Sequence, residues 1–194
     1  MYRTRIHRTL LSRCASALWD WWGNVRFYWV TTNKTPAIVL LVAGLAVAGF
    51  AYLLQSVFAD RFDQQNLHCL ALNVYYEARG EPRSGQYAVA EVTMNRVASP
   101  YFPDTVCAVV YEKRWDSLRR RYVGAFSWTE LHRRPAPEGK EWRRAWEVAE
   151  TVYRNRHEPK LHGVLHYHAA YIKPSWSRGR RPVAQIGKHL FYRS

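Results

Sequence analysis

The stretch Leu67–Ala98 reads LHCLALNVYYEARGEPRSGQYAVAEVTMNRVA and predicts two helices joined by a tight turn. Its first part repeats apolar residues at helical spacing: Leu67, Leu70, Ala71, Val74 and Ala78. We expect this helix to end near Gly80, which can adopt the left-handed conformation of a C-terminal cap, because Pro82 cannot continue it. Ser84 can then cap a second helix, which is apolar over most of its circumference and therefore central to the fold.

Glu77 lies on the same face of the first predicted helix as Leu70 and Val74, so its carboxyl group should point inward. Partial burial and the negative end of the helix dipole both disfavour the ionised form, and we expect them to raise the pKa of Glu77. A general acid that works near neutral pH needs such a pKa. The alternative is an ion pair with Arg79 or Arg96, which would lower the pKa and make the glutamate structural.

The later segments predict a mixed fold. Asp104 is expected to cap a short helix through Tyr111, and the basic, aromatic stretch 113–122 is expected to be an exposed loop or a groove wall. Apolar spacing predicts a helix from about residue 138 to 155, and alternating residues predict a short strand on each side of the loop 173–182. The fold class is therefore α+β and predominantly helical.

The segment Pro36–Phe58 contains no charged residue and is long enough to cross a bilayer as one helix. A cleaved signal peptide is the main alternative, since VFA at residues 57–59 is a tolerable cleavage sequence. We expect a retained anchor, because a signal peptide has a shorter apolar stretch. The chain then divides into a basic, aromatic-rich tail (1–35), a transmembrane anchor (36–58), a polar linker (59–66) and a globular domain (67–194).

Basic residues predict the orientation of this span. Six precede it, against the single acid Asp20: Arg3, Arg5, Arg8, Arg13, Arg26 and Lys34. Because the cytoplasmic side retains Lys and Arg, we expect a cytoplasmic N-terminus and a catalytic domain on the outer side. The tail also carries aromatic residues that suit the inner membrane interface, although a loosely ordered tail is an equal alternative: Trp19, Trp21, Trp22, Tyr28 and Trp29.

Charge and cysteine usage agree with export of the domain. The formal net charge is +14, and about +9 remains without the N-terminal segment, so a polyanionic partner is expected. Outside the inner membrane this partner would be a cell-wall or surface polymer, and no nucleic acid is expected. Cys14 should stay reduced, whereas Cys69 and Cys107 would meet an oxidising compartment and form a disulfide, unless they are buried free thiols.

Four other polar residues are candidates for a site. Asn95 interrupts an apolar helix, where it would orient Glu77 or a substrate amide, or serve as a satisfied core amide. His166, His168 and His189 invite a metal hypothesis, but no acidic or cysteine ligand of matching spacing accompanies them. We therefore expect no metal and no cofactor, and assign these rings to packing or to stacking against sugars.

These motifs, with the later FSWT (126–129), HYHAAYIKPSWS (166–177) and IGKHLFY (186–192), resemble the cell wall hydrolase family typified by the spore cortex-lytic enzyme. The resemblance covers about residues 67–192. It implies a lysozyme-like catalytic domain that cleaves peptidoglycan between N-acetylmuramic acid and N-acetylglucosamine, commonly as a lytic transglycosylase. It also implies that Glu77, the first glutamate of EARGE, is the catalytic acid and base, while Gly80 and Glu81 shape the turn behind it.

A single carboxyl group suffices for transglycosylation, because Glu77 would protonate the glycosidic oxygen and then accept the proton of the muramic acid 6-hydroxyl. A hydrolase would need a second carboxylate at a defined separation. Helix surface or capping explains the remaining candidates Glu91, Asp104 and Glu112, and Glu81 is expected to be solvated. Family-like motifs nominate the following groove residues: Tyr76, Asn95, Ser127, Trp128, Tyr167 and His168.

The chain departs from the spore enzyme because it has no recognisable peptidoglycan-binding repeat and carries an apolar span instead. A periplasmic domain on a bacterial inner membrane, in cell wall remodelling or phage-type lysis as an endolysin, fits better than a spore-cortex role. Amidase activity on the stem peptide and a catalytically inactive wall-binding anchor remain alternatives. Nucleic-acid binding through Arg119–Arg121 conflicts with the expected orientation, and the sequence does not predict an oligomeric state.

Overall fold

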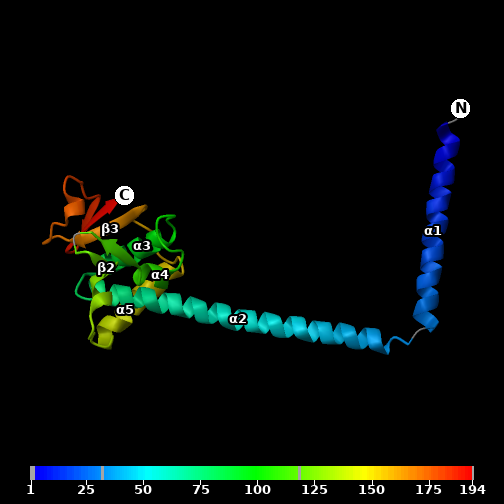
Figure 1. Cartoon of the computed structure of the whole chain (residues 1–194), viewed down its shortest axis with the longest axis horizontal. Helices are drawn as coiled ribbons and strands as arrows, with labels where there is room; N and C mark the ends of the chain where they lie inside the picture. Colours follow the sequence, from blue (N-terminus) through cyan, green and yellow to red (C-terminus); the bar gives the residue numbers. More distant parts are fainter. Residues whose placement is uncertain (1–2, 32, 118, 194) are drawn as a thin grey trace. The chain divides into compact units, whose positions relative to one another are not determined.

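The computed structural model describes residues 3–31, 33–117 and 119–193, and the side chains from residue 17 onward (Figure 1). The prediction for Cys14 therefore lies outside the described side chains. The chain forms two compact units, residues 1–57 and 58–194. The second unit contains the region that resembles a catalytic domain.

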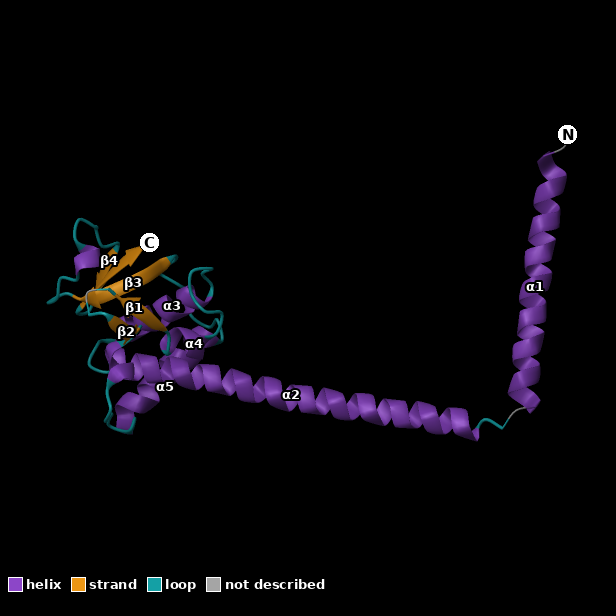
Figure 2. Cartoon of the chain, viewed as in Figure 1, coloured by secondary structure: helices purple, strands orange, loops and turns teal. Residues whose placement is uncertain are grey.

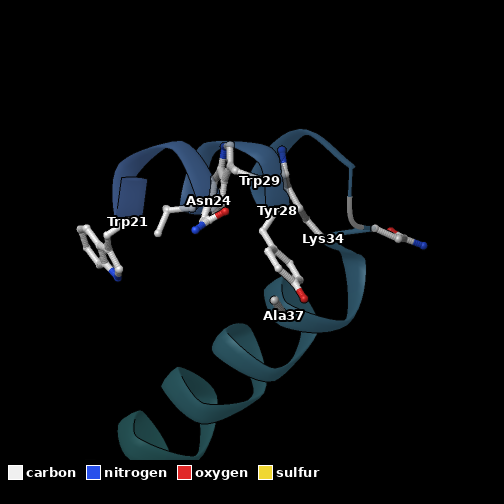
Figure 3. A pocket seen from close by; sticks show the side chains of 8 residues that line it. Trp21, Asn24, Tyr28, Trp29, Lys34 and Ala37 are labelled. Carbon is white, nitrogen blue, oxygen red and sulfur yellow. The ribbon is translucent and has the colours of Figure 1, made fainter. Parts of the chain in front are cut away.

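The first unit contains helix α1 (Arg3–Thr31) and the start of helix α2 (Thr35–Ala78). Asn33 precedes α2, and its Oδ1 accepts a hydrogen bond from the backbone N–H of Thr35 at 3.1 Å. Where the two helices meet, aromatic residues of α1 surround an apolar hollow of about 520 Å³ (Figure 3). Lys34 also lines this hollow, and its ammonium group lies 4.5 Å from the centre of the Trp29 ring.

Helix α2 is long and apolar enough to cross a membrane, and the apolar window in it is not buried in the structure. A signal sequence near the N-terminus would meet the same criteria. The helix also continues without a break through residues 59–66, where a separate polar linker was predicted. The expected end near Gly80 is confirmed, because α2 finishes at Ala78, but Gly80 does not adopt the predicted left-handed conformation.

Helix α3 (Arg83–Val97) is the centre of the second unit, as predicted, and Val89, Ala90 and Val92 on it are fully buried. It packs against helices α4 (Val106–Val110) and α5 (Gly139–Tyr153) and against strand β3. Figure 1 shows these helices gathered near the end of α2.

Two predicted caps are wrong by one or two residues. Pro82 occupies the N-cap of α3, so Ser84 lies inside the helix. The proline ring restricts the backbone angle φ at this boundary, so the helix begins directly after it. Thr105, and not Asp104, caps α4, since its hydroxyl oxygen accepts a hydrogen bond from the Ala108 N–H at 3.2 Å. Both corrections leave the helices themselves in place.

Two small antiparallel sheets complete the unit (Figure 2). Strands β3 (Val164–Ala169), β5 (His189–Arg193) and β4 (Ala184–Ile186) form one sheet in that order, so the predicted pair of strands is confirmed and a third joins it. Strands β1 (Lys113–Asp116) and β2 (Arg121–Gly124) form a hairpin in the stretch predicted as a loop. Short 3₁₀ turns follow at Ser127–Glu130 (η1) and Ser175–Ser177 (η2). The predominantly helical α+β class is thus confirmed.

Cross-links between distant segments hold the unit together. Cys69 of α2 and Cys107 of α4 are joined by a disulfide, with 5.2 Å between their Cα atoms. Glu81 was predicted to be solvated, but this prediction is wrong, since the side chain is buried. Its Oε2 accepts a hydrogen bond from the backbone N–H of Lys188 at 2.8 Å, which compensates for the lost water. This bond ties the turn after α2 to the turn between β4 and β5.

Glu91 corrects a second prediction, since it is buried in α3 and does not lie on a helix surface. Its Oε2 accepts hydrogen bonds from the backbone N–H groups of Lys160 and Leu161, both at 2.8 Å, and its Oε1 lies 2.7 Å from Nε2 of His157. One carboxylate thus satisfies two backbone donors of the segment that leads into β3. Such fully paired burial is stabilising, whereas removal of the acceptor leaves buried donors without partners.

We therefore expect Glu91→Ala to lower the free energy of unfolding of the second unit by about 3 kcal/mol. Chemical denaturation of the purified full chain measures this. Glu147→Ala is the matched control, because Glu147 forms an exposed ion pair with Arg83, worth roughly 0.5 kcal/mol. Equal losses in both variants would contradict the anchoring role of Glu91.

Candidate active site

A hollow of about 610 Å³ opens where the end of α2, the 3₁₀ turn η1, and strands β3 and β5 come together. It contains five of the six predicted groove residues together with Glu77. Its described lining is Tyr76, Glu77, Arg79, Ser127, Trp128, Leu131, Pro135, Tyr167, His168, Ala169, Tyr171, Ile172, Pro174, Trp176 and His189.

Asn95 is the predicted groove residue that does not line this hollow. Its amide nitrogen donates hydrogen bonds to the backbone oxygens of Leu161 at 2.6 Å and Val164 at 3.1 Å. The structure therefore places it as a satisfied core amide, which was one of the two interpretations that the sequence left open.

Glu77 lies in the last turn of α2, and Tyr167 from β3 donates its phenolic hydrogen to Glu77 Oε2 at 3.1 Å. Burial raises the pKa of Glu77 above its ordinary value, while the Tyr167 hydrogen bond and the charge of Arg96 partly oppose that rise. Burial also raises the pKa of Tyr167 well above its ordinary value, so the phenol remains a donor. The prediction of a raised pKa for Glu77 is confirmed.

Neither arginine forms the ion pair that was considered as an alternative role for Glu77. The Arg79 guanidinium lies 5.4 Å from the centre of the Tyr75 ring. Arg96 is buried, donates from Nε to the backbone oxygen of Leu165 at 2.8 Å, and has its guanidinium carbon 5.1 Å from the centre of the Phe126 ring. Arg96 therefore acts on Glu77 through its electric field and leaves the carboxyl group able to be protonated.

The aromatic wall of the hollow is fixed by hydrogen bonds from the helices. Trp128 donates from Nε1 to Asn73 Oδ1 at 2.9 Å, and Asn73 in turn donates from Nδ2 to Thr93 Oγ1 at 3.0 Å. Tyr76 stacks on Trp128 with 4.7 Å between ring centres, and its hydroxyl donates to the backbone oxygen of Pro135 at 2.7 Å. Hydrogen bonds within the protein thus hold both rings of the wall.

The three histidines of the metal hypothesis have aromatic surroundings. His168 stacks on Tyr192, and its Nε2 lies 3.0 Å from the Tyr192 hydroxyl. His166 packs against Trp176, and His189 meets the edge of Tyr167. Among the residues with described side chains, no group of three or more His, Cys, Asp or Glu is placed to hold a metal ion.

Sequence reasoning missed several residues of the hollow. Tyr171 and Trp176 line it from the segment after β3, and both are exposed there. His189 reaches it from β5, and its Nδ1 is buried without a hydrogen-bond partner among the described residues. The aromatic richness of 166–177 indicated this wall, but only the fold brings it into the same hollow as Trp128.

Glu77 is the one carboxyl group in the described lining of the hollow. A buried carboxyl group with a raised pKa holds its proton to a higher pH than an exposed one, and it can give that proton to a ligand atom within reach. The aromatic rings offer flat apolar faces, and Ser127 offers a hydroxyl group. This arrangement suits acid catalysis on a ligand with both ring-shaped apolar faces and polar groups.

The model of the Cell Wall Hydrolase family matches residues 80–192, more than half of the chain. The chain therefore belongs to this family, and the resemblance seen in its motifs is confirmed. Glu81 lies inside the matched range, and Glu77 lies just before it.

The chain is similar to spore cortex-lytic enzymes, being 32% identical over 130 residues to that of Oceanobacillus iheyensis and 30% identical over 130 residues to that of Bacillus subtilis. Each match covers 67% of this chain, but 42% and 38% of those relatives. The chain thus spans about two fifths of the length of these curated relatives.

Two solved structures are also similar. The catalytic domain of the Bacillus cereus SleB protein is 31% identical, with 66% of this chain and 89% of that chain covered and a TM-score of 0.46. The catalytic domain of the germination-specific lytic transglycosylase SleB from Bacillus anthracis is 30% identical, with 66% and 93% covered and a TM-score of 0.48.

The raised pKa of Glu77 predicts a pH-dependent stability. Because the folded chain holds this proton above the pH at which the unfolded chain releases it, the free energy of unfolding should fall as the pH rises from the ordinary pKa towards the raised one. Glu77→Gln has no proton to lose, so it should gain stability relative to the wild type between about pH 4 and pH 8. Denaturant titrations at both pH values measure the difference, and parallel curves would contradict it.

Proposed function

We propose that this chain cleaves the glycan strands of peptidoglycan between N-acetylmuramic acid and N-acetylglucosamine, as a lytic transglycosylase. The observation that carries the proposal is the single buried carboxyl group of Glu77, with its raised pKa, in an aromatic-lined hollow. Membership of the Cell Wall Hydrolase family supports peptidoglycan as the substrate. The names of the relatives, spore cortex-lytic enzymes, support the same class of polymer.

In the first step, protonated Glu77 gives its proton to the glycosidic oxygen as the bond from that oxygen to C1 of muramic acid breaks. Positive charge then develops on the sugar, as in other glycosidases. The carboxylate left on Glu77 is stabilised by the Tyr167 hydrogen bond and by the nearby charge of Arg96. The same carboxylate next accepts the proton of the 6-hydroxyl, whose oxygen bonds to C1 and closes a 1,6-anhydro ring.

This route consumes no water and needs one carboxyl group, which is what the hollow supplies. Hydrolysis by inversion or retention would require a second carboxylate at a defined separation. Tyr76, backed by the buried Trp128, would stack against the sugars, while Ser127 and Tyr167 would contact their polar groups. His168 is buried with both ring nitrogens paired, so it would support the wall of the hollow. An amidase mechanism on the stem peptide would need a metal site, which the described residues around the three histidines do not form.

We further propose that residues 36–58 anchor the protein in a bacterial inner membrane in a single pass, with a cytoplasmic N-terminus and a periplasmic catalytic domain. The excess of basic residues before the span and the exposed apolar surface of α2 support this. An anchored enzyme in this position would act on the adjacent cell wall, in remodelling or in phage-type lysis.

The activity is tested by mass spectrometry of fragments that the full chain releases from purified peptidoglycan. We expect anhydro-muropeptides from the wild type and a loss of at least about a hundredfold in their rate of release by Glu77→Gln, because general acid–base catalysis contributes roughly a hundredfold or more. Fragments with reducing muramic acid ends would indicate hydrolysis instead. Free stem peptides, or full activity of Glu77→Gln, would overturn the mechanism, and bound but uncut glycan would favour the inactive wall-binding alternative.

The topology is tested with protease added to intact spheroplasts. We expect the protease to digest the catalytic domain while a cytoplasmic marker protein survives, and the N-terminal part to remain in the membrane after alkaline extraction. A protected domain would contradict the orientation and would revive nucleic acid as a partner. A chain that begins after residue 59 in the soluble fraction would show that the span is a cleaved signal peptide.

A further inference from the structure

The hairpin of β1 and β2 has two faces of different character. Directly paired residues share a face, so Trp115 and Tyr122 lie on the same side as Lys113, while Arg114 and Arg121 lie on the other. We call the side formed by Lys113, Trp115 and Tyr122 the aromatic face.

Ion pairs brace the opposite side of the hairpin. Arg114 bonds from Nε to Glu112 Oε1 at 2.8 Å, and Arg121 bonds through NH1 and NH2 to the two carboxylate oxygens of Glu130, at 2.9 and 3.3 Å. Arg119 pairs with Asp116 at 3.0 Å. A two-stranded hairpin is marginally stable alone, so these contacts to neighbouring segments hold it in place.

The aromatic face is open to solvent. Trp115 is 58% exposed and Tyr122 is 63% exposed, with their ring centres 5.4 Å apart and their planes at 73°. Lys113, beside them, has no ion-pair partner among the described residues. Two large rings that contribute little to the core, next to an unpaired ammonium group, form a surface suited to recognition.

The end of the hairpin contacts the turn that lines the candidate active site. Gly124 ends β2 opposite Lys113, and a side chain there would collide with Thr129 of η1. Glu130 of the same turn also accepts a hydrogen bond from the Gly124 N–H at 3.0 Å. The neighbours of these residues in η1, Ser127 and Trp128, line the hollow that holds Glu77. The hairpin is therefore attached to the turn that forms part of the wall of the hollow.

We propose that the aromatic face binds the glycan strand of peptidoglycan beyond the sugars that occupy the hollow. The inference rests on the proposed function, and it assigns Trp115 and Tyr122 to stacking on pyranose rings and Lys113 to the carboxylates that the polymer carries. Nucleic acid fits this surface less well, because Arg119 and Arg121 already form ion pairs with Asp116 and Glu130. The groups left on the hairpin without an ion pair among the described residues are the two rings, Lys113 and Arg120 in the turn.

The experiment compares two substrates that differ in length. The full chain, in detergent, is given long glycan strands and, separately, a tetrasaccharide of the same polymer. For the double variant Trp115→Ala/Tyr122→Ala we expect kcat/KM on long strands to fall about tenfold through a higher KM, with a much smaller change on the tetrasaccharide. Lys113→Gln should weaken binding of long strands and reduce its dependence on salt.

Two further variants keep the test interpretable. Trp115→Phe/Tyr122→Phe retains flat rings and should recover most of the preference for long strands even if the alanine variant folds poorly. Phe62→Ala is the control, because Phe62 is an exposed aromatic residue on α2 outside the hairpin and the hollow, and it should behave as the wild type.

The outcomes separate this inference from the proposed function. If the wild type cleaves neither substrate, the proposed function fails. If the wild type cleaves both and the alanine variant loses activity on both equally, the hairpin does not bind the distal strand and the inference is overturned. The inference is likewise overturned if the phenylalanine variant loses the preference for long strands as fully as the alanine variant does, or if the aromatic face binds DNA in preference to glycan.

Discussion

Burial of one carboxyl group, that of Glu77, is the constraint on which the site depends. Removing a carboxylate from water is costly, and the structure offsets that cost only partly, with one hydrogen bond from Tyr167 and the field of Arg96. The incomplete compensation leaves the protonated form accessible, which acid catalysis requires. The surrounding structure must therefore hold the end of α2 and strand β3 in place against this unfavourable burial.

Two other buried carboxylates, those of Glu81 and Glu91, link the segments around the site and differ from Glu77 in their hydrogen bonds. Glu91 accepts hydrogen bonds from two backbone N–H groups and contacts His157, and Glu81 accepts one from Lys188. Their hydrogen bonds join segments that lie far apart in the sequence and hold the residues that directly precede β3 and β5. These two strands carry Tyr167 and His189, which line the hollow. The kind of donor separates the anchors from the candidate acid: backbone N–H groups bind Glu81 and Glu91, whereas a phenol binds Glu77.

Local patterns predicted much of this molecule, because helix periodicity and punctuation are local. The end of the helix that bears Glu77, the central α3 and the strand pair follow from the spacing of apolar residues and from Gly80 and Pro82. The burial of Glu81 and Glu91 was not predictable in the same way, since their partners lie 107 and up to 70 positions away. The hairpin was missed because five basic residues in 113–121 conceal a short alternation.

Net charge illustrates how composition and structure differ as guides to function. The formal charge of +14 already subtracts the acidic side chains, so it indicates only the sign of a partner, while the structure shows which basic groups are held in place. Arg96 is buried, Arg121 is held by Glu130, and Arg154 is held by Asp63 at 2.7 Å. The surfaces that remain distinctive, in the hollow and on the hairpin, are aromatic. Recognition by flat rings with a few charges beside them suits a sugar polymer with scattered carboxylates better than a densely charged polyanion.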